Sequence, residues 1–290
     1  MIRFRDEIYR RSVPVTLEAP IIRTRDRMES FRDIFNEYSL GRWIIGINIL
    51  NSPLGRPTPD PVIIGYLLQS EMDIEAIPHI PVSIENKYTL LRMLIGASIL
   101  GIRNLLVVGG DVKMDGVEYG DVVNTIRGFS DGYIDMGGSR YRVEENDFYI
   151  GGALIPGRAG EVERVLYKIG LGLRFFQTQI IFSGEHLIGL LDSLLDGIGS
   201  DIVIPVLIGV TPYIDGRVMD ILSGITLDEG SRRMLKRIRG EYLSHLIEVL
   251  SGVIDYFSGV NTIKIGIHLM PIIWCSRVAE SISMLLEELT

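Results

Sequence analysis

The sequence predicts an α/β protein of the (β/α)8 TIM-barrel class, folded as a single domain. Eight apolar runs rich in Ile and Val lack polar alternation, which is typical of strands buried on both faces of a parallel sheet. Segments with the helical spacing of apolar residues separate these runs. A length of 290 residues fits eight βα units, and the right-handed crossover rule favours their closure into a barrel.

The eight runs share a short length and branched apolar residues, and they are 13–19, 43–50, 75–84, 104–111, 148–155, 175–182, 202–212 and 262–270. Helical spacing is clearest in four segments, which are 88–101, 161–172, 233–257 and the closing stretch 275–290. An open, doubly wound sheet is the alternative arrangement of the same elements. Because no Pro-, Gly- or Ser-rich linker divides the chain, we expect one domain over 1–290 with a short N-terminal extension over 1–12.

Composition limits the classes of function. With 47% hydrophobic and 23% charged residues, the chain can bury a large core. A net charge of −8, with no cluster of five or more Lys and Arg, argues against a nucleic-acid partner and favours a small molecule. The one cysteine, Cys275, excludes an internal disulfide framework and a Cys-based zinc site. A charged N-terminus and apolar runs about half a bilayer crossing in length predict a cytoplasmic protein without membrane spans.

Polar residues at the carboxyl ends of the predicted strands are the candidates for function, because barrel enzymes place their chemistry there. In chain order they are Glu18, Asn48, Asn51, His79, Asp111, Arg158, Gln179, Thr211 and His268. Asn51 and Thr211 lie next to Pro and are interpreted as turn formers. His79 is interpreted first as a core histidine. Gln179 lies two residues after Gln177 and should face the same side of the strand. We therefore expect a buried amide whose hydrogen bonds are made by a ligand or by a network inside the barrel.

Familiar catalytic motifs are missing from the sequence. The segment 111–118 begins like a calcium loop, but Lys113 and Val122 occupy two of its ligand positions. The segment 170–174 lacks the third Gly of a dinucleotide fingerprint. HExxH, GxSxG and GxxxxGK[ST] do not occur, and the four His residues have no ligand spacing, so we expect no metal site.

Several blocks of the sequence resemble the methylenetetrahydrofolate reductase family. The stretch 77–111 has that family's His at the end of the third strand, the phrase GIRN and a fourth strand ending in Gly-Asp. The stretch 167–182 resembles its Lys-x-x-x-Gly-x-x-x-x-x-Thr-Gln segment, with matching spacing from Lys168 to Gln179. The stretches 16–20 and 204–212 resemble its first-strand Glu region and its Pro-Gly-Ile-x-Pro strand. These blocks occur in the family's order, one per strand.

The resemblance implies a barrel that holds a flavin, expected to be FAD, and reduces a methylene-tetrahydropterin to its 5-methyl form with hydride from NADH or NADPH. It implies Glu18 as the acid that protonates N10 and Asp111 as the group that stabilises an N5 iminium. We expect substrate contacts from Gln179 and Asn48. The implied cofactor contacts are His79, Gly110, Tyr119, Pro156, Arg158 and Lys168.

Departures from the family pattern leave alternatives open. Gly109 stands where the family has an Arg on the flavin, and the family's Arg near the end of the eighth strand has no counterpart in 267–273. FAD held differently, FMN, or direct hydride transfer from a nicotinamide or a deazaflavin are therefore all compatible with the sequence. The substrate is a folate or a tetrahydromethanopterin-type carrier. A pterin-dependent one-carbon transferase and a pterin-binding protein are the alternative functions, and a homo-oligomer or a partner subunit is compatible with amphipathic outer helices.

Overall fold

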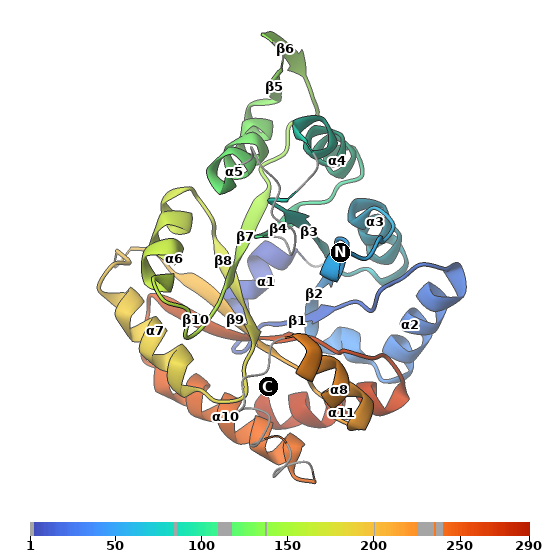
Figure 1. Ribbon diagram of the computed structural model, residues 1–290, viewed down its shortest axis with the longest axis vertical. Helices are drawn as coiled ribbons and strands as arrows, with labels where there is room; N and C mark the ends of the chain where they lie inside the picture. The colour runs from blue at the N-terminus through green and yellow to red at the C-terminus, as the bar shows by residue number, and fades with distance from the viewer. Residues whose placement is uncertain are drawn as a thin grey trace.

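Eight parallel strands close into a barrel in the order β1-β10-β9-β8-β7-β4-β3-β2, which confirms the predicted (β/α)8 class. The computed structural model describes residues 3–83, 86–109, 118–136, 138–199, 201–225, 235 and 240–290. Figure 1 looks into the ring of strands, with the helices arranged around it. Each strand pairs in parallel with its two neighbours, so all carboxyl ends meet at one end of the barrel.

All eight predicted strands are present, with boundaries a few residues inside the predicted ones. They are β1 (Val15–Glu18), β2 (Ile44–Ile49), β3 (Ala76–Pro81), β4 (Asn104–Val108), β7 (Tyr149–Leu154), β8 (Phe175–Ile180), β9 (Ile204–Val210) and β10 (Ile263–Leu269).

Helices connect the strands and cover the outside of the barrel. They are α1 (Phe4–Arg10), α2 (Arg25–Glu37), α3 (Pro61–Met72), α4 (Lys87–Ile99), α5 (Tyr119–Arg127), α6 (Glu161–Gly170), α7 (Glu185–Leu195), α8 (Gly216–Ile225), α10 (Tyr242–Phe257) and α11 (Ser276–Leu289). The described residues also form short 3-10 turns, which are η1 (Leu40–Arg42), η2 (Pro53–Gly55) and η3 (Gly128–Asp131). Polar caps fix several helix starts: Thr24 accepts a hydrogen bond from the backbone of α2, Asp60 from that of α3 and Asn86 from that of α4.

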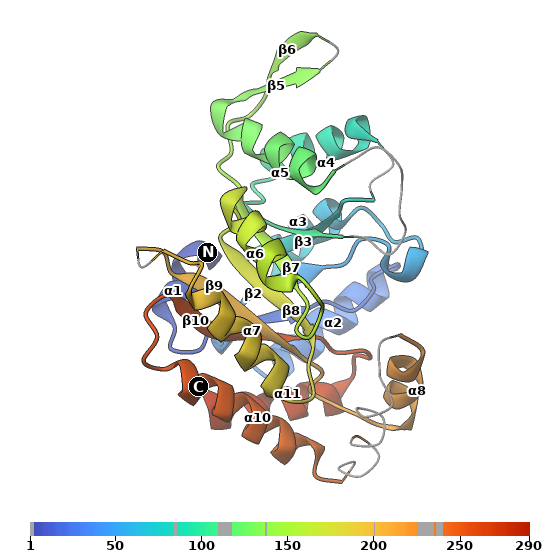
Figure 2. The ribbon, with the colours of Figure 1, turned by 60° about the vertical axis from the view of Figure 1, so that its left-hand side comes forward.

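An antiparallel hairpin interrupts the βα alternation, and the sequence pattern did not predict it. Strands β5 (Tyr133–Met136) and β6 (Ser139–Arg142) pair with each other and project from the barrel beyond α4 and α5 (Figures 1 and 2). Only Ile134 of these eight strand residues is buried. Because the hairpin buries so little apolar surface, its residues lack the continuous apolar run by which the barrel strands were recognised.

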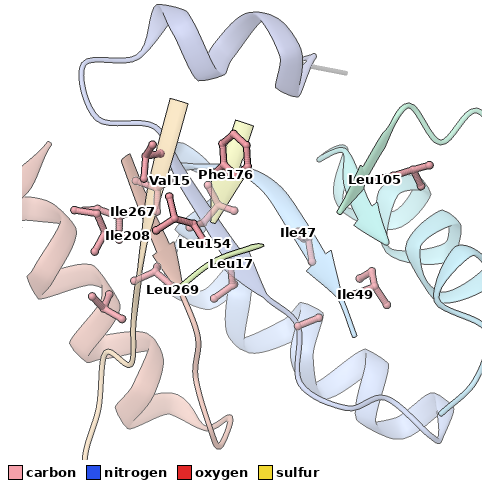
Figure 3. Packing of buried hydrophobic residues seen from close by; sticks show 14 of the residues in the cluster. Val15, Leu17, Ile47, Ile49, Leu105, Leu154, Phe176, Ile208, Ile267 and Leu269 are labelled. Atoms are coloured by element: carbon pink, nitrogen blue, oxygen red, sulfur yellow. The ribbon is translucent and has the colours of Figure 1, made fainter. Parts of the chain in front are cut away.

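The main hydrophobic core lies between the barrel and its helices. Outward-facing residues of successive strands form this layer, as Figure 3 shows for Val15 and Leu17 of β1, Ile47 of β2 and Ile208 of β9. Alternate residues of the same strands face the interior of the barrel. In β1 these are Thr16, which lies between Val15 and Leu17, and Glu18, which follows Leu17.

The amino-terminal end of the barrel is closed by α1, which lies within the predicted extension 1–12. Phe4 and Ile8 are fully buried, and Phe4 contacts Phe175 edge-on with ring centroids 5.2 Å apart. The backbone N–H of Phe4 donates to the buried Glu75 carboxylate at 2.9 Å, which satisfies one helix N-terminal donor. Figure 2 shows α1 at one end of the barrel and α8 at the other. Helix α1 therefore blocks the interior of the barrel at its amino-terminal end.

Candidate active site at the carboxyl ends of the strands

A cleft of about 2200 Å³ opens at the carboxyl ends of the strands. Its size exceeds that of a pocket for one drug-sized ligand. It brings together seven of the ten residues that the sequence singled out, which are Glu18, His79, Tyr119, Pro156, Arg158, Lys168 and Gln179. Asn48 lies behind this surface, fully buried and bonded to His79. Gly110 and Asp111 lie outside the described residues.

Glu18 is the last residue of β1 and is only 9% exposed. Burial raises the pKa of its carboxyl group to about 8, because the charged form has lost its hydration. Among the described residues no Arg or Lys forms an ion pair with it, and the nearest basic atom is Nε2 of His268, 4.0 Å from Oε2. Glu18 therefore carries a proton at neutral pH and faces a cleft where it can donate it.

A pair of buried amides forms the floor beneath this acid. Asn48 donates from Nδ2 to Oε1 of Gln177 at 2.7 Å, and Gln177 donates from Nε2 to Oδ1 of Asn48 at 3.1 Å. Gln177 donates its second hydrogen to Oγ1 of Thr16 at 3.2 Å. Burying these groups unpaired would cost on the order of 1–3 kcal/mol each, so the reciprocal pairing is what allows an amide layer inside the barrel.

Two buried histidines end this hydrogen-bonded layer, and both line the cleft. Nε2 of His79 lies 3.0 Å from Nδ2 of Asn48, and Nδ1 of His268 lies 2.9 Å from Oγ1 of Thr16. Burial lowers the pKa of His79 to about 4 and that of His268 to about 3, the latter with a smaller contribution from His79. Both imidazoles are therefore neutral at pH 7 and present hydrogen-bonding nitrogen atoms without a charge.

Gln179 does not occupy the buried position expected for it. Gln177 pairs with Leu207 and Ile180 pairs with Gly209, so two residues of β8 oppose one of β9, which is a β-bulge. The bulge is fixed by the hydroxyl of Thr178, which accepts from the N–H of Gly209 at 2.8 Å. It moves Gln179 out of the interior alternation, so its side chain is exposed at the edge of the cleft, and Gln177 is the buried amide.

A basic group of residues lines the cleft beside β7 and α6. Lys168 is 8% exposed, lies with Nζ 5.4 Å from the ring centre of Tyr119, and donates to the carbonyl oxygen of Ala153. Burial lowers its pKa to about 8, although the nearby Glu161 acts in the opposite direction. Arg158 forms an ion pair with the buried Glu161, whose other oxygen accepts from the N–H of Ile155 at 2.9 Å.

The charge of the cleft differs in sign from that of the chain. Among the described residues, six basic side chains line it: Arg27, Arg56, Arg92, Arg158, Arg164 and Lys168. Three acidic side chains line it, Glu18, Asp60 and Asp220, and the first is protonated at neutral pH. The described lining of the cleft is therefore mainly basic although the protein has a net charge of −8, and such a lining favours an anionic ligand.

Sequence reasoning missed the residues that connect the site. Thr16 is not among the sequence-based candidates. Gln177 enters only as the residue whose side of the strand Gln179 is expected to share, and His268 is a strand-end candidate to which no role is assigned. Side chains two residues apart in a strand lie on the same face, so the position of Glu18 could have indicated that Thr16 also faces the interior of the barrel. Contacts across the barrel, such as that between Asn48 and Gln177, depend on closure and have no signal in the sequence.

Neither a metal-binding cluster nor a membrane-spanning helix occurs in the part of the chain that the structure describes. Its His, Cys, Asp and Glu residues include no group of three or more arranged to hold a metal ion. None of its helices combines the length and the apolar character needed to cross a bilayer.

Comparison with known proteins shows likeness of fold. No protein-family model matches this sequence, and no curated protein matches it. An uncharacterized protein from Clostridium thermocellum that binds two copies of 5-methyl-5,6,7,8-tetrahydrofolic acid aligns with a TM-score of 0.72 at 17% identity, over 98% of this chain and 99% of that chain. A protein from Aquifex aeolicus VF5 aligns with a TM-score of 0.55 at 11% identity, over 100% and 98%. Oxaloacetate acetylhydrolase aligns with a TM-score of 0.50 at 10% identity, over 97% and 82%.

Proposed function

We propose that this barrel binds a reduced pterin in its cleft and reduces a methylene-tetrahydropterin to the 5-methyl form, with Glu18 as the general acid. The observation that carries the proposal is a protonated carboxyl group at the end of β1, beside a layer of neutral hydrogen-bonding groups. The Clostridium thermocellum protein, whose fold is similar over almost the whole chain, binds 5-methyltetrahydrofolate, the product of such a reaction.

The reaction requires an acid with the properties of Glu18. Protonation of N10 and cleavage of its bond to the methylene carbon open the five-membered ring, with the bonding electron pair passing to N10. The methylene carbon is left as an iminium at N5, which accepts hydride and becomes the methyl group. An acid acts best when its pKa lies near the working pH, and burial moves Glu18 into that range.

The amide and imidazole groups provide recognition of the pterin ring. Gln179 lies exposed at the edge of the cleft, where it can bond the ring from above the amide floor. His79 lines the cleft as a neutral group held by Asn48. The role of Asp111 at the iminium stays a prediction of the sequence, as does that of Gly110 in cofactor binding.

The basic side chains along β7 and α6 fit an anionic cofactor or an anionic pterin tail. The Lys168 ammonium has three donor hydrogens, and Ala153 accepts one of them. A phosphate at this position would raise the pKa of Lys168 again and keep it charged. A Cβ added at Gly109 would meet no atom of the described residues within 4 Å, so these residues leave the position of the family's Arg open.

These features support FAD or FMN as the group bound there, with Lys168, Arg158, Tyr119 and Pro156 beside it. When bound, a flavin carries hydride from a reduced nicotinamide to the substrate. If no flavin is bound, the same cleft has the volume for the pterin and for NADH or NADPH together.

Turnover tests the proposal directly. Purified protein is incubated with 5,10-methylenetetrahydrofolate and NADH or NADPH, with and without added FAD or FMN, and 5-methyltetrahydrofolate is quantified. We expect product with the wild type and a loss of roughly 10²-fold or more with Glu18→Gln, the scale of a lost general acid. A yellow protein whose flavin absorbance decreases when NADH or NADPH is added would identify a flavin as the cofactor.

Two outcomes would overturn parts of the proposal. Tight pterin binding without product under every donor would contradict reduction and favour a pterin-binding protein or a one-carbon transferase. Normal turnover by Glu18→Gln would remove Glu18 from the acid role while leaving the reductase in place.

A further inference from the structure

In the pair formed by Glu18 and His268 the proton is on the carboxylic acid, whereas such a pair in water carries it on the histidine. A carboxylic acid and an imidazole in water exchange a proton to give a carboxylate and an imidazolium, because the pKa of His exceeds that of Glu. Here the pKa of Glu18 is raised to about 8 and that of His268 is lowered to about 3, both chiefly by burial. The acid keeps its proton although a nitrogen atom lies 4.0 Å away.

A directed chain of hydrogen bonds explains which nitrogen of His268 carries the proton. With the amides oriented as in the structure, both hydrogens of Gln177 Nε2 are donated, one to Asn48 and one to Thr16. The Thr16 oxygen therefore accepts from Gln177, and its own hydrogen is available for Nδ1 of His268 at 2.9 Å. Nδ1 is then an acceptor, which leaves the imidazole proton on Nε2, the atom that faces Glu18.

We infer that His268 is a positioning residue for Glu18: the Thr16 hydroxyl holds its Nε2–H tautomer, which leaves Glu18 no nitrogen to accept its proton and donates to the carboxylate left after proton transfer. This role rests on the proposed function of Glu18. The separation of 4.0 Å is too long for a hydrogen bond, and such contacts often shorten when substrate binds. His268 exchanges no proton with the pterin.

Other groups around Glu18 do not perform this function. On the neighbouring strand β2 the residue opposite Glu18 is the uncharged Asn48. His79 is neutral and bonded to Asn48. Charged side chains lining the same cleft are Arg27, Arg56, Asp60, Arg92, Arg158, Arg164, Lys168 and Asp220, and none of them forms an ion pair with Glu18 among the described residues.

The Thr16 hydroxyl can be removed with little change in shape by Thr16→Val, and Thr16→Ser is the matched control that keeps it. Without the hydroxyl, the neutral imidazole can carry its proton on Nδ1. Nε2 then accepts from the Glu18 carboxyl group and no longer donates to its carboxylate, which raises the pKa of Glu18. We expect the alkaline limb of the kcat/KM profile, assigned to Glu18, to move up by one pH unit or more in Thr16→Val. In Thr16→Ser it stays in place. An unchanged limb in a folded Thr16→Val protein would overturn the inference.

Two measurements do not depend on turnover, so failure of the proposed function can be told apart from failure of this inference. The 15N shifts of His268, assigned with His268→Gln, should show a proton on Nε2 in the wild type, and a proton on Nδ1 would contradict the inference. Infrared titration of the Glu18 carboxyl band, identified by its loss in Glu18→Gln, should show the same upward shift in Thr16→Val. If these shifts occur without 5-methyl product, the pair is as described and the reductase assignment is wrong.

Discussion

Asn48 and Gln177 exchange two hydrogen bonds through the centre of the barrel, although their strands, β2 and β8, stand opposite each other in the ring of eight. The pair ties two walls together at the level where the apolar interior ends and the cleft begins. Below it lie Phe4 and Phe175 of the interior apolar cluster, and above it lies Glu18. The floor of the cleft is thus polar, neutral and fully hydrogen-bonded.

Loss of the buried amide should destabilise the protein. We expect Gln177→Leu to lower the free energy of unfolding by about 1–3 kcal/mol, because Asn48 would keep buried polar atoms without partners. Gln179→Leu is the matched control, two residues away and exposed, with an expected change within about 0.5 kcal/mol. Urea unfolding measures both. Equal effects of the two substitutions would contradict the burial of Gln177 and the position of the bulge.

Glu18 should give the protein a stability that falls as pH rises. Its pKa is about 8 in the folded state, above the value of the unfolded chain, so between these values the folded state binds the extra proton. His79 and His268 act in the opposite sense, but only below about pH 6.5, where the unfolded chain begins to protonate them. Between pH 6.5 and 8 the wild type should therefore lose about 1.4 kcal/mol per pH unit relative to Glu18→Gln. If the free energy of unfolding changes with pH in the same way in the wild type and in Glu18→Gln, Glu18 has the pKa of an ordinary carboxyl group.

Lys168 should contribute to binding of a phosphate-bearing cofactor. We expect Lys168→Met to weaken FAD binding about tenfold or more in a fluorescence titration, equivalent to about 1.4 kcal/mol. Lys87→Met is the control, because Lys87 is an exposed lysine at the start of α4. If both variants bind FAD as the wild type does, Lys168 does not contact the phosphates.

Helix α1 should be required for a stable barrel. Phe4 is fully buried against Phe175 and Tyr149, with ring centroids 5.2 Å and 6.0 Å away. Its truncation in Phe4→Ala should cost about 3–5 kcal/mol, the range for deleting a buried aromatic ring. Tyr88→Ala, at a side chain that is 66% exposed, is expected to have little effect on thermal unfolding. A similar small effect of Phe4→Ala would mean that α1 is dispensable.

The barrel could be predicted because its strands are buried on both faces and leave continuous apolar runs in the sequence. The strand-end rule then located the cleft and lining residues such as Glu18, His79 and Gln179, and the family resemblance added Tyr119, Pro156 and Lys168. The hairpin β5–β6 escaped because it buries little. Gln179 was placed wrongly inside because a bulge at Thr178 shifts the alternation, and a bulge depends on the neighbouring strand. Thr16 and His268 owe their roles to contacts between strands far apart in the chain.

The central claim is that the cleft binds a reduced pterin, and calorimetric titration with 5-methyltetrahydrofolate tests it most directly. Gly109 borders the cleft, and no atom of the described residues lies within 4 Å of a Cβ added there, so Gly109→Trp should obstruct the ligand. Ile99→Trp alters an exposed position on α4. We predict saturable binding to the wild type and to Ile99→Trp, and a loss of affinity of at least tenfold in Gly109→Trp. Absence of binding to the wild type, or equal binding to all three proteins, would contradict the account.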